Sequence, residues 1–202
     1  MEIRIAVTNE EKQAVYRSRC TASPDERHHP VVDPEDENSW LIHAVRADGE
    51  IVGSYRITRG SDGFSLPQIA RYELEPFLTE LPPRVLAVIE RLVLSPTRDD
   101  GDLAVALLQG TQQIPGWDGI LVVFGACSAQ VASRHLPFPA IYHAHRTNGA
   151  DHNDLVRITA FPHGTEPLIG LGEGPGLPTC VEEIARALDV RGGLGAPQND
   201  SS

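Results

Sequence analysis

The sequence has few aromatic residues, few cysteines and no long apolar run. Aromatic residues make up 5% of the 202 positions, and no stretch of about 18 consecutive apolar residues is present to span a bilayer. The N-terminal MEIRIAV has no basic region before its apolar residues, unlike a secretory signal peptide. The three cysteines are odd in number and contain no CxxC pair, which favours reduced thiols. These absences predict a cytoplasmic protein that does not enter membranes.

Positive charge is also scarce. Lys and Arg total 17 against 28 Asp and Glu, which gives a formal net charge of −11. Phosphate backbones and anionic lipids repel such a chain, so we expect neither nucleic acid nor membrane as a partner. The same charge argues weakly against an acidic carrier protein. An apolar content of 41% still allows a globular core, and the abundance of Gly, Pro and Arg over Lys is typical of a high-GC bacterial source.

Helical and strand patterns alternate along the chain. The Asp48-Gly49 pair predicts a hairpin between two strands, and Thr8 followed by Glu11 predicts a helix start. We expect one domain over residues 1–165, an extension with a short helix over 166–190, and a disordered tail over 191–202. The expected strands are 3–7, 40–46, 51–58, 88–94, 119–126 and 155–161, and the expected helices are 8–20, 67–81, 103–113, 128–136 and 179–188.

Charged residues interrupt several apolar segments. A buried charge is costly unless it is paired, so we expect these residues to meet at a shared cleft. The alternative is a structural network of ion pairs, which would place the same residue types together without any ligand. The residues concerned are Arg17, Asp33, Asp36, Arg56, Glu90 and Arg91.

The loop before the third helix has the shape of a phosphate site but an acidic composition. Arg98 and Gly101 are arranged as in loops that place backbone amides around a phosphate. Asp99, Asp100 and Asp102 would repel a phosphate, but carboxylates also suit the start of a helix. We therefore interpret Asp102 as an N-cap and expect poor binding of a diphosphate here.

The order of these features resembles the GNAT acyltransferase superfamily, and within it the branch of acyl-homoserine-lactone synthases and N-acyl amino acid synthases. The resemblance covers roughly residues 12 to 162. It rests on Val15-Tyr16-Arg17, on Asp33 and Asp36 before the Trp40 strand, on Gly53 and Arg56 in GEIVGSYRI, and on ERLVL. It implies an α/β fold of the α+β type, with a mixed, mostly antiparallel central sheet flanked by helices. This branch usually places its Glu three residues before its Arg, whereas Glu90 and Arg91 are adjacent.

The resemblance also implies two ligand sites. One would hold the amino-acid end of S-adenosylmethionine or another small-molecule amine, and the other would hold an acyl-CoA or acyl carrier protein thioester. Leu103 departs from the Gly or Ala of the family's diphosphate loop. The residues implied for the amine are Arg17, Asp33, Asp36, Trp40, Arg56 and Arg91, and those for the thioester are Leu92, Val93, Leu94, Arg98 and Gly101.

Acyl transfer to an amine needs a proton acceptor and a proton donor for the leaving thiol. Glu90 is our candidate general base, and Tyr142 is our candidate proton donor, with a partly buried structural tyrosine as the alternative. Cys127 is interpreted as structural because no nucleophile elbow surrounds it. The histidines, among them His143 and His145, lack the spacing of a zinc site, so we expect no metal.

Three functions therefore stay open. The first is an N-acyltransferase that joins an acyl thioester to an amino-acid-like amine. The second is a synthase-like enzyme that cleaves or cyclises S-adenosylmethionine alone, which the acidic loop favours. The third is a GNAT-shaped binding protein without catalysis, which the displaced Glu and Leu103 would permit.

Overall fold

The structure is a computed structural model, and it describes residues 1–22, 32–95, 100–128, 140–144 and 155–160. The α-helices are α1 (Asn9–Ala22), α2 (Leu66–Tyr72), α3 (Glu75–Glu80) and α4 (Asp100–Gln109), and the 3-10 helices are η2 (Pro34–Asn38), η3 (Gly60–Asp62), η4 (Pro83–Val85), η5 (Gly110–Gln113) and η6 (Trp117–Gly119). The strands are β1 (Glu2–Ile5), β2 (Trp40–Val45), β3 (Ile51–Arg59), β4 (Leu86–Leu94), β5 (Val122–Ser128), β6 (Ala140–Ala144) and β7 (Leu155–Ala160).

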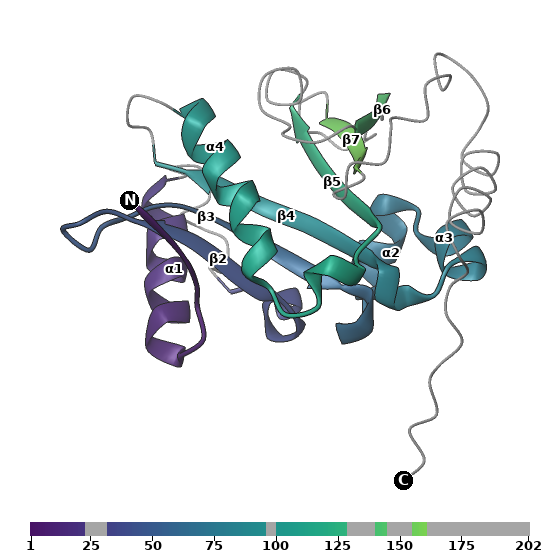
Figure 1. The fold of residues 1–202 in the computed structure, drawn as a ribbon, viewed down its shortest axis with the longest axis horizontal. Helices are drawn as coiled ribbons and strands as arrows, with labels where there is room; N and C mark the ends of the chain where they lie inside the picture. Colours follow the sequence, from purple (N-terminus) through teal and green to yellow (C-terminus); the bar gives the residue numbers. More distant parts are fainter. Residues whose placement is uncertain (23–31, 96–99, 129–139, 145–154, 161–202) are drawn as a thin grey trace, which may run out of the picture.

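The strands form one seven-stranded sheet in the order β1-β2-β3-β4-β5-β7-β6 (Figure 1). Only the contact between β4 and β5 is parallel, and the other described pairs are antiparallel. The expected mixed, mostly antiparallel sheet is therefore confirmed. No described helix is both long enough and apolar enough to cross a bilayer.

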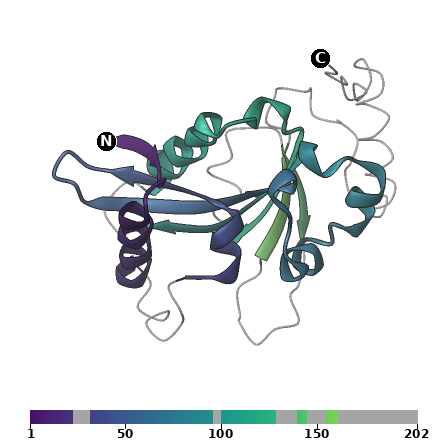
Figure 2. The same ribbon diagram turned by 90° about the horizontal axis from the view of Figure 1, so that it is seen from below.

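Helices cover both faces of the sheet. Side chains alternate between faces along a strand, so Tyr55 and Ile57 of β3 face one side, where they pack in a core with Leu107 of α4. Arg56 and Thr58 face the other side, where α1 and α2 lie. Figure 2 shows α4 and α1 on opposite sides of the sheet. Apolar residues on this second face form two smaller cores. One core includes residues of α1, and the other includes residues of α2 and α3.

Several local predictions are confirmed. The Asp48-Gly49 hairpin joins β2 to β3, with Gly49 at φ +89, a value that favours glycine. Helix α1 begins as the capping box predicts: the Thr8 N–H donates to the Glu11 carboxylate at 2.8 Å, and the Glu11 N–H donates to the Thr8 hydroxyl at 3.2 Å. Short-range polar patterns of this kind need no tertiary context to act.

Other predictions were wrong. The expected helix over residues 67–81 is two helices, because Glu73 adopts a left-handed conformation at φ 49. Helix α4 begins at Asp100, so Asp102 lies in its first turn and is not its N-cap. Residues 140–144 form strand β6, although the surrounding Pro-rich sequence predicted an irregular segment. Ser128, where a helix was predicted to begin, is the last residue of β5. The rest of that predicted helix, the helix predicted at 179–188, and the boundaries at 165 and 190 lie outside the described residues.

Candidate functional site

A charged network lies on the face of the sheet that α1 and α2 cover. Its centre is Arg56, which is 1% exposed in the middle of β3. Arg56 Nη1 donates to Asp33 Oδ2 at 3.0 Å and to Asp36 Oδ1 at 3.2 Å, and its Nη2 donates to Glu90 Oε2 at 2.7 Å. We call the following set the charged network: Arg19, Asp33, Glu35, Asp36, Arg56, Arg71, Glu90 and Arg91.

Two elements bring carboxylates to Arg56. Glu90 is its direct neighbour across the β3–β4 ladder. Asp33 and Asp36 come from the start of η2, where the Asp33 N–H donates to Asp36 Oδ2 at 3.0 Å and folds the acidic segment back on itself. The network thus joins residues that are far apart in the chain around one guanidinium.

A β-bulge explains how adjacent Glu90 and Arg91 reach the same network. Arg56 is opposite Glu90 while Ser54 is opposite Val93, so β4 has one more residue than β3 between the two pairs. Arg91 takes φ 55, a left-handed conformation that is costly for a residue other than glycine. Its Nε and Nη2 then donate to Asp33 Oδ2 and Oδ1 at 2.8 and 2.9 Å. Successive strand residues normally face opposite sides of a sheet. The bulge at Arg91 brings its side chain to the same side as the Glu90 side chain.

The network contains Arg19 in the place predicted for Arg17. Arg17 is exposed, whereas Arg19 is 5% exposed and its Nη1 donates to Asp36 Oδ2 at 3.0 Å. Among the residues of α1 up to Cys20, whose side chains the structure describes, Val15, Tyr16 and Arg19 are buried, which is the i, i+1, i+4 spacing of one helix face. That spacing was readable in the sequence and would have pointed to Arg19.

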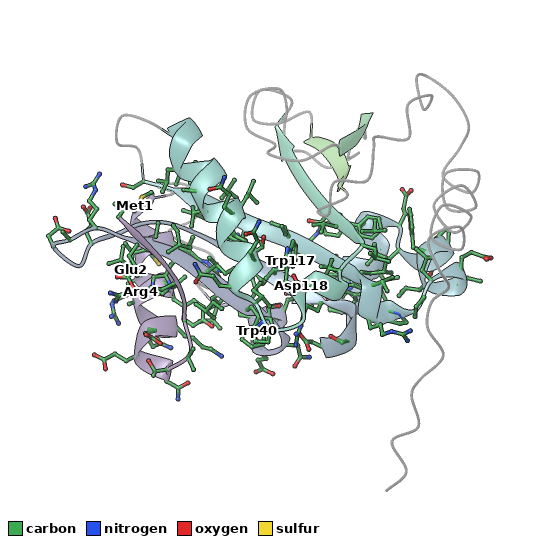
Figure 3. The ribbon with its side chains drawn as sticks, viewed as in Figure 1. Met1, Glu2, Arg4, Trp40, Trp117 and Asp118 are labelled. Carbon is green, nitrogen blue, oxygen red and sulfur yellow. The ribbon has the colours of Figure 1, made fainter. Side chains whose placement is uncertain are left out.

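Trp40 also lies away from the network. It packs against the core that contains Trp117 (both labelled in Figure 3), on the α4 side of the sheet. Its Nε1 donates to Asp62 Oδ2 at 3.1 Å, and Arg59 stacks on its ring at 5.1 Å from the centroid. Arg56 is on the opposite face because it is the cross-strand neighbour of Leu41, one residue after Trp40.

Two network contacts come from α2, which the sequence did not suggest as part of a site. Gln68 Nε2 donates to Glu90 Oε2 at 2.8 Å and to Thr58 Oγ1 at 2.9 Å. Arg71 Nη1 donates to Glu90 Oε1 at 2.5 Å. The capping box of Ser65 with Gln68 marks the helix start, and that pattern could have predicted α2 but not what Gln68 contacts.

The network lowers the pKa of two of its carboxyl groups, Asp33 and Glu90. Burial by itself would raise the pKa of Asp33, but the hydrogen bonds and charge of Arg91, with Arg56 and Arg19, outweigh burial and lower it. Burial would likewise raise the pKa of Glu90, but Gln68, Arg56 and Arg71 lower it below its ordinary value. For Arg56 burial would lower the pKa, and the charges of Glu90, Asp36 and Asp33 raise it.

Of the other predicted site residues, Leu92, Val93 and Leu94 form the end of β4. The parallel ladder between β4 and β5 runs from Leu86 opposite Val122 to Ile89 opposite Gly125. Beyond it β5 turns away toward β7 (Figure 1), while Leu92, Val93 and Leu94 continue along β3. Gly101 is in the first turn of α4 and Tyr142 is in β6. The surroundings of Gly101 and the Tyr142 side chain lie outside the described part of the structure, as does Arg98.

Comparison with known proteins identifies the fold. No protein-family model matches the sequence, and no curated protein matches it. Among solved structures, FeeM, an N-acyl amino acid synthase from uncultured soil microbes, aligns with a TM-score of 0.60 at 15% identity over 79% of this chain and 90% of its own. The acyl-homoserine-lactone synthase LasI aligns at 0.56 with 9% identity, over 79% of this chain and 89% of its own.

A third structure covers almost the whole sequence. MesI, a CoA-dependent acyl-homoserine lactone synthase, aligns with a TM-score of 0.52 at 19% identity over 99% of this chain and 100% of its own. The chain has the GNAT-like fold of these synthases. The predicted resemblance is thereby confirmed at the level of the fold. Sequence identities this low do not identify a substrate.

Within this GNAT-like fold, no described residues form a group of three or more His, Cys, Asp or Glu arranged to hold a metal ion. The histidines considered above, His143 and His145, lie outside the described side chains. The candidate site is an assembly of guanidinium, carboxylate and amide groups that includes Glu90, next to the point where β4 and β5 separate.

Proposed function

We propose that the chain is an N-acyltransferase that transfers an acyl group from a thioester to the amine of an amino-acid-like acceptor, with S-adenosylmethionine as the candidate acceptor. One observation carries the proposal: the charged network ends at Glu90, beside the point where β4 and β5 separate. The named activities of FeeM, LasI and MesI support it, since all three are synthases of N-acylated products. The thioester would be an acyl-CoA or an acyl carrier protein.

In this reaction the amine nitrogen attacks the thioester carbonyl and forms the C–N bond of an amide. The C–S bond breaks, and the thiol leaves with a proton that the amine gives up. The enzyme must therefore hold the acceptor with its nitrogen beside the carbonyl. It must also stabilise the oxyanion of the tetrahedral intermediate and move one proton.

The partly exposed members of the network suit a zwitterionic acceptor. Arg91 has 34% of its side chain exposed while it contacts Asp33, and Arg71 has 51% exposed while it contacts Glu90. A guanidinium can bind a carboxylate through two parallel hydrogen bonds, and Glu90 can accept from an ammonium group. Arg56, at 2% side-chain exposure, serves to hold the three acidic groups and not to contact the ligand.

The lowered pKa of Glu90 bears on its role as a general base. An efficient base has a pKa near the working pH. Burial by itself would raise the pKa of Glu90, but Gln68, Arg56 and Arg71 outweigh burial and lower that pKa from its ordinary value. Such a group is a weak base and a good site for an ammonium ion. We therefore propose that Glu90 orients the amine and that the amine releases its proton to water.

A pH–rate profile tests this role. We expect kcat/KM to rise with pH until the acceptor amine is deprotonated, about pH 8 for an α-amino group, and Glu90→Gln to remove most turnover at every pH. A limb that instead ends below pH 4.5 would show that ionisation of Glu90 alone limits the reaction. Unchanged turnover in Glu90→Gln would remove the residue from the mechanism.

The donor site is proposed along Leu92–Leu94, where the edge of β4 that faces β5 is released from the parallel ladder. Strand edges of this kind can hydrogen-bond an extended chain such as a pantetheine arm. The diphosphate of coenzyme A would lie near the start of α4, where Gly101 is flanked by Asp100 and Asp102. Each added contact with a carboxylate costs on the order of 1 kcal/mol in a solvated setting.

We therefore expect free coenzyme A to bind more weakly than micromolar. Isothermal titration calorimetry measures this directly, and changing Asp99 and Asp100 to Asn should tighten the binding severalfold. Exchange of Glu80, an exposed acid far along the chain, for Gln is the matched control. Micromolar binding by the unmodified protein that the Asn variants do not improve would show an ordinary diphosphate site.

The same acidic helix start favours a second candidate, an enzyme that acts on S-adenosylmethionine alone. TofI has been crystallised in a ternary complex with an inhibitor and MTA. Thermal-shift measurements with coenzyme A, acetyl-CoA and S-adenosylmethionine separate the candidates, because a bound ligand raises Tm by mass action. Release of thiol from an acyl-CoA series in the presence of the amine supports the transferase. Cleavage of S-adenosylmethionine without any thioester supports the second candidate, and binding without either reaction supports a non-catalytic protein.

A further inference from the structure

Arg56, Gln68 and Arg71 donate to the Glu90 carboxylate and differ sharply in exposure, and the buried Tyr72 hydroxyl also hydrogen-bonds Glu90. Arg56 and Gln68, which both donate to Oε2, are 1% exposed. Arg71, which donates to Oε1, has 51% of its side chain exposed, while the Glu90 side chain is 4% exposed. Among the described residues, Arg71 is therefore the partner that lies between the Glu90 carboxylate and solvent.

Charge balance makes this position distinctive. The charged network contains four guanidinium groups (Arg19, Arg56, Arg71 and Arg91) and four carboxylates (Asp33, Glu35, Asp36 and Glu90). Without Arg71, three positive charges would face four negative ones. The positive charge removed is the one that contacts Glu90 Oε1. A single positive charge at that position restores the balance.

The Arg71 contact is also the easiest of the Glu90 contacts to exchange. The Arg71 guanidinium is half exposed, so water competes for it more than for the enclosed partners of Glu90. The contact of Glu90 with Arg56 is enclosed on both sides, at 2% and 4% side-chain exposure, and breaking such a pair costs more. A competing cation would therefore replace Arg71 and leave Arg56 and Gln68 in place.

We propose that Glu90 Oε1 is a binding site for a primary ammonium group, and that Arg71 occupies this site in the ligand-free protein. The amine acceptor would displace the Arg71 guanidinium and take over its contact with the carboxylate. Arg71 would then favour acceptors that carry a positive charge, since a neutral amine cannot replace the lost ion pair. The identity of the ligand as an acyl acceptor rests on the proposed function, whereas the cation site itself does not.

Small cations test the site without reference to catalysis. In Arg71→Ala, guanidinium chloride and methylammonium chloride at millimolar concentrations should raise Tm saturably, by about 3–5 °C at ten times the dissociation constant. NaCl at the same ionic strength provides the salt control. The double variant Arg71→Ala/Glu90→Gln should show no saturable rise. Arg84→Ala, which removes another exposed arginine, should also show none.

The outcomes distinguish the two proposals. The absence of a saturable rise in Arg71→Ala overturns the cation site, and a large loss of Tm that neither cation restores would give Arg71 a structural role. Arg71→Gln repeats the titration if the alanine variant does not fold. If methylammonium binds but no amine is acylated by the wild type, the cation site stands and the transferase fails. If both stand, Arg71→Ala should change the ratio of KM for neutral amines to KM for charged amines.

Discussion

Arg56→Ala will strongly destabilise the protein. The side chain is enclosed in the middle of β3 and donates to Asp33, Asp36 and Glu90. Removing it leaves these carboxylates buried without their shared partner, and breaking a buried ion pair in this way costs about 3–5 kcal/mol. For a chain of this length we expect Tm to fall by roughly 10 °C or more.

Urea denaturation and thermal melts of the ligand-free variants measure this effect. Arg17→Ala is the matched control, because Arg17 is exposed on α1 and such surface changes stay within about 0.5 kcal/mol. Arg56→Lys should recover only part of the loss, since one ammonium group cannot reproduce a planar guanidinium that serves separate carboxylates. A ligand-free Arg56→Ala protein as stable as the wild type would mean that the network is solvated, and Arg56 would again be a candidate for direct ligand binding.

The sequence predicted the sheet and much of the charged network for a simple physical reason. Arg56 and Glu90 interrupt strands that are otherwise apolar, and charges in such strands must pair with something. Residues opposite each other on adjacent strands meet directly, so the ladder between β3 and β4 delivers that pair. The hairpin at Asp48-Gly49 fixes the neighbouring strand from two residues alone.

The remaining features depend on backbone details that no local pattern records. The left-handed conformation of Arg91 turns an adjacent Glu-Arg pair toward one face, and nothing in ERLVL distinguishes this bulge from a regular strand. Gln68 and Arg71 reach Glu90 from α2, which ends at the break at Glu73 where a single longer helix was expected. The family resemblance implied that Trp40 contacts the amine, but the two-residue period of β2 directs its side chain to the other side of the sheet.

Glu90→Gln should reduce stability in a pH-dependent manner. At neutral pH the variant loses the charge that faces Arg56 and Arg71. Its amide NH2 group, which is a donor, takes the place of one acceptor oxygen and faces other donors without a hydrogen bond. Hydrogen bonds to charged groups are worth about 1.5–3 kcal/mol each, so we expect a loss of at least 2 kcal/mol at pH 7. Burial, which would raise the pKa of Glu90, is outweighed by Gln68, Arg56 and Arg71, so the folded-state pKa is lowered from 4.5.

The lowered pKa fixes the direction of the pH dependence. A carboxyl whose pKa is lower in the folded than in the unfolded state adds stability above the unfolded value, and that stability disappears as pH falls through the folded pKa. The difference in unfolding free energy between wild type and Glu90→Gln should therefore be constant from pH 7 to about 5 and shrink below pH 4.5. Urea denaturation at a series of pH values measures this, with Glu80→Gln as the control at an exposed glutamate. A difference that stays constant to pH 3 would contradict it, because the neutral carboxyl would then stabilise the network as well as the ionised one does.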